Sequence, residues 1–135
     1  MPKGSLFNTL NKIIIYPDAS SRAVSAKSST NSDFQLLKRA GFSVKAPNKN
    51  PPILDRVKSL NSALKTGLVK VSVDKAPQVV DALESQAYNP KTELPEKTAT
   101  ADNSADDIND ALGYMVSYIY PLIRKSVSQR KLKGI

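Results

Sequence analysis

Acidic residues crowd the beginning of one apolar segment near the C-terminus, and their types and spacing are suited to binding a metal ion. Asp106, Asp107 and Asp110 interrupt a run whose apolar residues recur at helical spacing. Ser104 is a candidate N-cap, and carboxylates in a first helical turn are stabilised by the positive end of the helix dipole. Asp110 lies a turn further in, where that explanation weakens. Because residues three and four apart are neighbours on a helix, Asp107, Asp110 and Tyr114 form one strip, which is either a solvated acidic patch or the edge of a metal site.

A further aspartate follows the first expected strand. The run NKIIIY predicts a strand, and Asp18 comes just after it, next to Pro17. Ligands of open α/β sheets bind at the carboxyl ends of strands, although an aspartate after proline also commonly forms a turn. Oxygen ligands from a strand end and from a helix start can converge on two magnesium ions. Such ions hold a scissile phosphate and activate water.

The composition limits the chemistry. The 135 residues include no cysteine and no histidine, which excludes disulfides, thiolate chemistry, the usual zinc sites and histidine bases. Any metal must be held by oxygen ligands, which favours Mg²⁺ or Mn²⁺. Neither GxxxxGK[ST] nor GxGxxG occurs, so the sequence predicts no nucleotide-binding loop of these types. GxSxG is missing as well, and a serine triad cannot form without histidine.

Positive charge is unevenly distributed along the chain. The net charge is +8 with a pI near 9.7, and no acidic residue follows Asp110. Such basic segments attract phosphate backbones without reading base sequence, although a basic tail can also serve solubility alone. The candidate DNA-binding residues of the C-terminal tail are Arg124, Lys125, Arg130, Lys131 and Lys133, and a second basic group comprises Lys38, Arg39, Lys45 and Lys49.

Strand and helix patterns alternate along the chain. The expected strands are NKIIIY, FSVKA (42–46) and LVKVSV (68–73), and the expected helices are 32–41, 50–67, 76–89 and the acidic segment from 104. Ser32 is a candidate N-cap, Gly41 and Gly67 are expected helix ends, and Pro121 is expected to kink or end the last helix. Strands that alternate with helices predict the α/β class, with a largely parallel sheet covered by helices.

Four motifs in this order resemble the C-terminal nuclease domain of a tailed-phage terminase large subunit, the motor that packages DNA. The similarity runs from about Lys12 to Tyr118. It rests on IIIYPDASSRAVSAKSSTNSDFQLLKRAGF, on NPPILDRVKSLNSAL, on LVKVSVDKAPQVVDALESQAYNP with the following ELPEK, and on DDINDALGY. The last resembles the family's Asp-His-x-x-Asp-Ala-x-x-Tyr motif, with Asp107 where histidine is often seen.

The resemblance implies an RNase H-like mixed sheet flanked by helices. It also implies a two-metal site that cuts concatemeric duplex DNA without sequence specificity during genome packaging. By motif, Asp18 is then the second acidic ligand and Asp110 the third, with Asp107 an adjacent ligand or support and Asp106 a helix cap. Ala111 and Gly113 would let the last helix pack closely on the sheet.

One departure from the family pattern concerns the first catalytic aspartate. In the family it lies on an N-terminal strand that this sequence lacks, and the ATPase domain is missing too. We therefore expect an N-terminally truncated RNase H-like nuclease domain over 1–125 and a basic C-terminal tail over 126–135.

The implied partners are double-stranded DNA, the missing N-terminal part of the terminase, the portal and the small terminase subunit. The implied location is the host cell cytoplasm. No apolar signal core and no membrane-length apolar run occurs in the sequence, so neither secretion nor membrane insertion is expected. The alternative function is a non-catalytic basic module for DNA binding or assembly, in which the acidic residues are structural.

Overall fold

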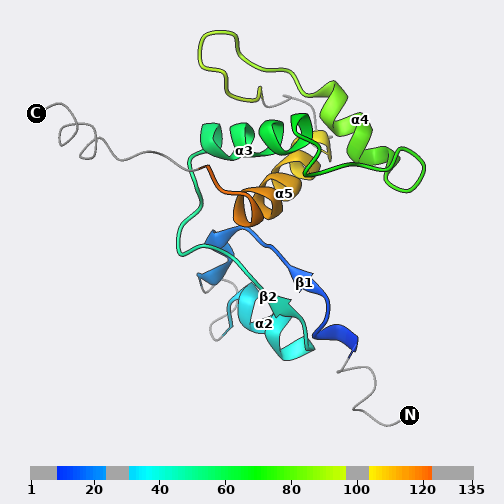
Figure 1. Ribbon diagram of the computed structural model, residues 1–135. Helices are drawn as coiled ribbons and strands as arrows, with labels where there is room; N and C mark the ends of the chain where they lie inside the picture. The colour runs from blue at the N-terminus through cyan, green and yellow to red at the C-terminus, as the bar shows by residue number, and fades with distance from the viewer. Residues whose placement is uncertain (1–8, 24–30, 97–103, 123–135) are drawn as a thin grey trace, which may run out of the picture.

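The computed structural model describes residues 9–23, 31–96 and 104–122, and in them a two-stranded parallel sheet and four α-helices form a mixed α/β structure (Figure 1). The elements form two groups. The sheet lobe contains β1 (Ile14–Ile15), the 3₁₀ helix η1 (Ala19–Arg22), α2 (Asp33–Ala40) and β2 (Ser43–Val44). The helical lobe contains α3 (Ile53–Lys65), α4 (Pro77–Ser85) and α5 (Ser104–Ile119). In Figure 1 the sheet lobe lies below α5, and α3 and α4 lie on the other side of that helix.

The sheet lobe is a strand–helix–strand unit. Ile14 pairs with Ser43 and Ile15 pairs with Val44 in parallel register, so the chain must cross over between the two strands, and α2 lies in that crossover. The expected cap of α2 is confirmed, because the Ser32 hydroxyl accepts from the Gln35 backbone N–H while the Gln35 side chain accepts from the Ser32 N–H.

The end of α2 is also where the sequence predicts it. Gly41 follows the helix in the left-handed conformation, at φ 105°, and its N–H donates to the carbonyls of Leu37 and Lys38. A residue with a Cβ is strained at this backbone geometry, so glycine suits the position. The turn at Gly41 sends the chain directly into β2.

The main core lies between α3 and α5. Leu60 and Ala63 of α3 and Val116 of α5 are buried, and Val116 is fully buried. Half-buried apolar side chains surround them, namely Leu64, Val69, Leu83, Leu112 and Met115. Burying a leucine side chain contributes about 1.5–3 kcal/mol, so this cluster is a major source of stability for the helical lobe.

The contact between α4 and α5 includes a polar element as well. The side-chain amide of Asn109 on α5 donates to the Ala82 carbonyl at 2.8 Å and to the Gln86 side chain at 3.1 Å. Ala82 lies in the last turn of α4, where backbone carbonyls have no partner within the helix. Asn109 therefore helps to close the end of α4 against α5.

The expected strand at 68–73 is wrong. This segment adopts no strand in the structure, although its residues alternate in hydrophobicity. Leu68 and Val73 are 59% and 67% exposed, while Val69 packs against the core and donates its N–H to the Ala63 carbonyl. Alternation predicts a strand only where another strand supplies a hydrogen-bonding partner. Here the segment leaves the end of α3, and its apolar side chains divide between the helical core and the surface.

The last helix ends before Pro121. Helix α5 stops at Ile119, in agreement with the rule that the residue before a proline avoids the helical conformation. The side chain of Ser104, the expected N-cap, lies outside the described residues. Within the described part of the chain, every helix is too short or too polar to cross a lipid bilayer.

Candidate functional site

Asp18 lies where the sheet lobe meets the helical lobe. Its Oδ1 accepts hydrogen bonds from the backbone N–H of Ser20 at 2.8 Å and from the side-chain amide of Asn50 at 2.5 Å. Its Oδ2 accepts from the hydroxyl of Tyr114, at 3.0 Å. The turn-forming function expected for this residue is therefore present, because Asp18 caps η1. The same carboxylate also contacts residues from two other parts of the chain.

Asn50 is the residue that holds the end of β1 against the segment before α3. Its amide nitrogen donates to Asp18, and its amide oxygen accepts from the Ala19 N–H at 2.9 Å. The segment before Asn50 is held in turn by Arg22, whose guanidinium donates to the Pro47 carbonyl and, at 2.8 Å, to the Ala46 carbonyl. These contacts fix the position of the Asp18 carboxylate relative to α3.

The Asp18 carboxylate is strongly held in its ionised form. Burial by itself raises the pKa of Asp18, but the hydrogen bonds from Asn50, Ser20 and Tyr114 outweigh it and lower the pKa to about 2. These donors favour the charged form because they stabilise a negative oxygen more than a protonated one. Asp18 is consequently an anion throughout the physiological pH range.

Asp110 forms an ion pair with α3. Its Oδ1 lies 3.0 Å from a terminal nitrogen of Arg56, and the side chains of Arg56 and Asp110 are 8% and 29% exposed, respectively. The interior turn of α5 therefore uses this carboxylate to bind a cationic side chain. The presence of Asp110 at this position of α5 is therefore explained by Arg56 rather than by the helix dipole.

Arg56 rests on two further residues of α5. Its guanidinium lies over the Tyr114 ring at 4.5 Å from the ring centroid, a distance suited to cation–π attraction. Gly113 leaves room for the aliphatic part of the arginine, because a Cβ at that position would lie 2.9 Å from Cγ and 3.0 Å from Cδ of Arg56. The expectation that Gly113 and Ala111 pack on the sheet is wrong, since Gly113 faces an α3 side chain and Ala111 is exposed.

The described structure connects two of the three candidate metal ligands. Tyr114 contacts Asp18 through its hydroxyl and Arg56 through its ring, and Arg56 contacts Asp110. Asp107 is exposed in the first turns of α5, whereas Asp106, the expected cap, is buried at 4% exposure. Within 9–23, 31–96 and 104–122, no group of three acidic side chains lies close enough together to hold an ion.

An open pocket of about 390 Å³ adjoins the network formed by Asp18, Tyr114, Arg56 and Asp110. It is lined by Asn50, Pro51, Ile53, Arg56, Leu94, Pro95, Asp110 and Tyr114. Three of the network residues therefore face a space that a small ligand or a phosphate group can enter. The network is accessible rather than sealed in the core.

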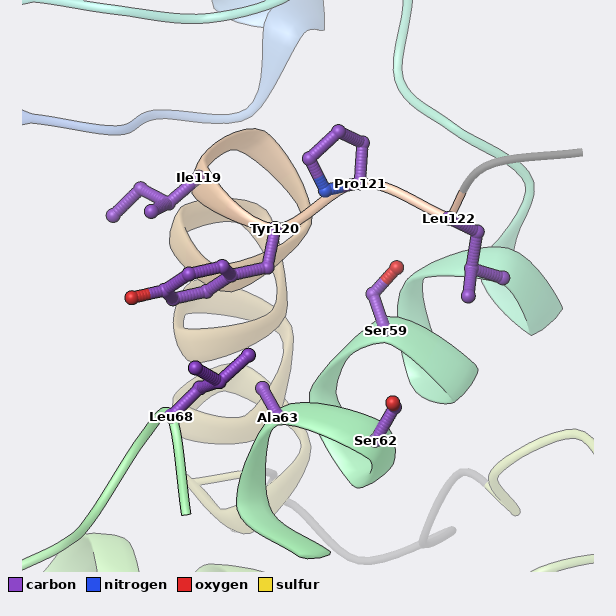
Figure 2. Close-up of a pocket in the computed structure, with 8 residues that line it drawn as sticks. All are labelled: Ser59, Ser62, Ala63, Leu68, Ile119, Tyr120, Pro121 and Leu122. Atoms are coloured by element: carbon purple, nitrogen blue, oxygen red, sulfur yellow. The ribbon is translucent and has the colours of Figure 1, made fainter. Parts of the chain in front are cut away.

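A second pocket, of about 470 Å³, lies between α3 and the end of α5 (Figure 2). Its lining is mainly apolar and comprises Ser59, Ser62, Ala63, Leu68, Ile119, Tyr120, Pro121 and Leu122. It contains no carboxylate, and none of its lining residues belongs to the network. Its chemistry is therefore unsuited to a metal ion.

Two groups of basic residues stand out in the sequence, and the structure describes one of them. Lys38, Arg39, Lys45 and Lys49 are exposed at the end of α2 and in the segment after β2. The candidate DNA-binding residues of the tail lie outside the described residues, namely Arg124, Lys125, Arg130, Lys131 and Lys133. This group thus lies on the sheet lobe, although other exposed lysines, such as Lys58, Lys65 and Lys70, lie on α3 or just after it.

Sequence reasoning missed the functions of Arg56 and Asn50. A signal for Arg56 exists, because it precedes the buried residues Leu60 and Ala63 by four and seven positions and so shares their helix face. The glycine in the middle of α5 is a second signal, since glycine destabilises a helix interior and is expected there only where another group approaches the backbone closely.

Comparisons of the chain with family models, with curated proteins and with solved structures find no match.

Proposed function

We propose that this chain is part of a metal-dependent DNA endonuclease, and that Asp18 and Asp110 are ligands of its divalent cation. The observation that carries the proposal is the chain of contacts from Asp18 through Tyr114 and Arg56 to Asp110. The two aspartates that the terminase resemblance marks as ligands lie far apart in the sequence and belong to one connected site. An RNase H-like fold is the architecture proposed with it, and the parallel pairing of β1 with β2 is consistent with that fold.

The donor set fits a hard cation. Both groups are carboxylates, and the sequence has neither histidine nor cysteine to bind softer metals. Mg²⁺ commonly takes one or two carboxylates and completes its shell with water and substrate phosphates. Oδ2 of Asp18 accepts one hydrogen bond from the described residues, and a carboxylate oxygen has two lone pairs. Asp18 and Asp110 therefore suit Mg²⁺ or Mn²⁺, and such an ion would supply Lewis-acid activation of a phosphodiester and of water.

The chain's own side chains have separate functions in this proposal. Asp18 supplies a permanent negative charge, because its pKa of about 2 keeps it ionised. Asn50 and Tyr114 fix the direction of that carboxylate by hydrogen bonds to its two oxygens. Arg56 fixes Asp110 and offsets part of the negative charge. A third acidic group would complete the site, and the terminase resemblance implies one on the family's first catalytic strand.

The proposed substrate is double-stranded DNA. The net charge of +8 favours a polyanion, and the exposed basic residues at 38–49 precede Asn50 on the same segment. Contacts from lysine and arginine to phosphates are independent of base sequence, which agrees with non-specific cutting of packaged DNA. In this proposal the basic tail contributes further phosphate contacts, and the portal and the small terminase subunit are partners of the complete protein during assembly in the host cytoplasm.

One observation favours a second candidate function. Arg56 already neutralises Asp110, and Asp18 is bound by three donors, so both carboxylates have structural functions without any metal. A non-catalytic DNA-binding or assembly module would need nothing more from them. The two functions differ in one requirement, because only the endonuclease needs a divalent cation at these residues.

A cleavage assay distinguishes the two functions. Supercoiled plasmid is incubated with the chain over a range of Mn²⁺ concentrations, and nicked product is measured for the unmodified protein, Asp18→Asn and Asp110→Asn. Asp81→Asn is the matched control, because Asp81 is exposed on α4 and outside the network. The proposal predicts nicking that requires Mn²⁺, persists in the control and disappears in the other two variants. DNA binding without nicking at any Mn²⁺ concentration would favour the binding module.

A further inference from the structure

The side chain of Arg56 is buried against α5, where three residues of that helix contact it. The Asp110 carboxylate binds the guanidinium at 3.0 Å, the Tyr114 ring lies beneath it at 4.5 Å, and the bare backbone of Gly113 accepts its aliphatic chain. Gly113 and Tyr114 follow Asp110 by three and four positions, so both lie next to it on the helix surface. The arginine itself is only 6% exposed.

Each of the three residues constrains the arginine in a different way. A planar guanidinium can bind a carboxylate through its edge while its face stacks on a ring, whereas a lysine ammonium has no planar face to stack. The position of the aliphatic chain is equally restricted, since even one added carbon at Gly113 would lie 2.9 Å from Cγ of Arg56. The position of Arg56 is therefore set by α5 as much as by α3.

The contacts continue beyond Arg56. Tyr114, whose ring supports the guanidinium, uses its hydroxyl to donate to Asp18 at 3.0 Å. A shift of the Tyr114 ring would therefore move its hydroxyl away from Asp18. One side chain thus constrains two carboxylates, Asp110 by direct contact and Asp18 through Tyr114.

We propose that Arg56 is a positioning residue for the site, which fixes Asp110 directly and fixes Asp18 through the ring and hydroxyl of Tyr114. Gly113 contributes to this positioning, because the absence of a side chain leaves the space that Arg56 occupies. The inference rests on the proposed function in so far as it concerns metal binding. The coupling between Arg56 and Asp18 is independent of that function.

Two variants separate positioning from charge. Arg56→Lys keeps the positive charge and removes the planar group. Gly113→Ala keeps Arg56 itself and displaces its aliphatic chain, and alanine favours the helical conformation over glycine, so α5 retains its local stability. Circular dichroism and thermal unfolding establish that each variant is folded. If Arg56→Lys does not fold, Gly113→Ala alone provides the test.

The first measurement follows the Tyr114 hydroxyl. The five tyrosines are labelled with ¹³C at Cζ, and the Tyr114 resonance is assigned by its loss in Tyr114→Phe. Positioning by Arg56 predicts that this resonance moves toward those of the exposed tyrosines in both variants, because the hydrogen bond to Asp18 is weakened. A purely structural link between α3 and α5 predicts lower thermal stability with the Tyr114 resonance unmoved, and that result would overturn the proposal.

The second measurement is the dissociation constant for Mn²⁺ alone, determined by electron paramagnetic resonance. Groups that orient a metal ligand typically change metal affinity by about 10- to 100-fold, so we expect Mn²⁺ binding at least roughly tenfold weaker in both variants. Unchanged affinity together with an unmoved Tyr114 resonance would contradict the positioning function. If the unmodified chain does not bind Mn²⁺, the proposed metal site fails, and the Tyr114 resonance alone decides whether Arg56 positions Asp18.

Discussion

The hydroxyl of Tyr114 lies 3.0 Å from Oδ2 of Asp18, and the two residues are 96 positions apart in the sequence. This hydrogen bond joins the sheet lobe to α5 at the candidate site. A second contact joins the same elements nearby, where the rings of Tyr16 and Tyr118 lie 5.5 Å apart. The position of α5 relative to the end of β1 therefore depends on tyrosines spaced one helical turn apart on one side of that helix.

Removal of the Tyr114 hydroxyl should destabilise the protein. Tyr114→Phe keeps the ring under Arg56 and removes the donor to a carboxylate, a type of hydrogen bond that contributes about 1.5–3 kcal/mol when buried. Because this contact is only partly buried, we expect a loss of about 1 kcal/mol in the free energy of unfolding, measured with urea at pH 7. Tyr120→Phe is the control and should lose little, since Tyr120 is exposed and lies in the other pocket. Equal losses in both variants would contradict the assigned function of the Tyr114 hydroxyl.

Stability should fall in acid in a way that depends on Asp18. The pKa of Asp18 is about 2 in the folded protein, below its ordinary value of 3.8, so the folded protein binds the proton less readily than the unfolded chain. A depressed pKa contributes stability that is complete above the unfolded value and is lost as pH falls through the folded value. We therefore expect the free energy of unfolding to decrease between about pH 4 and pH 2. In Asp18→Asn the decrease over this interval should be smaller. The same acid dependence in both proteins would show that other carboxylates account for it.

Substitution of Asn50 should affect both the stability of the protein and the pKa of Asp18. Asn50→Ala removes a donor to Asp18 and an acceptor for the Ala19 N–H, and the loss of two partly buried hydrogen bonds should cost about 1–3 kcal/mol. The variant should also raise the pKa of Asp18, because it removes the strongest of the hydrogen bonds that lower it. Urea unfolding and the carboxyl ¹³C titration of Asp18 measure the two effects.

The control for this prediction is Asn61→Ala, on the exposed side of α3. It should leave both the stability and the Asp18 titration close to those of the unmodified protein. An Asp18 titration that is unchanged in Asn50→Ala would show that the amide does not hold the carboxylate.

Local signals in the sequence predicted much of the fold. The cap at Ser32 and the glycine stop after α2 each depend on a few neighbouring residues, and the structure has them where the sequence predicts them. At Pro121 the sequence leaves a kink or an end open, and in the structure the helix ends. The prediction of a strand at 68–73 is wrong, because strand formation depends on a partner strand that is often far away in the sequence. Of the apolar residues in this segment, Val69 packs against the helical core, whereas Leu68 and Val73 are exposed.

The candidate site was only partly predictable for a similar reason. Asp18 and Asp110 stand out because a carboxylate at a strand end or within an apolar helix needs an explanation. Arg56 and Asn50 do not stand out, because an arginine on a helix and an asparagine before proline are common on surfaces. Their functions follow from contacts with residues more than thirty positions away, which no local pattern records.

The most direct test of the proposed site is a Mn²⁺ titration followed by nuclear magnetic resonance of the backbone amides. Paramagnetic Mn²⁺ broadens resonances close to where it binds. The proposed site predicts that broadening begins around Asp18 and Asp110, is reversed by excess Mg²⁺, disappears there in Asp110→Asn and persists in Asp81→Asn. Broadening centred on other acidic residues, or unchanged in Asp110→Asn, would contradict a metal site at these two aspartates.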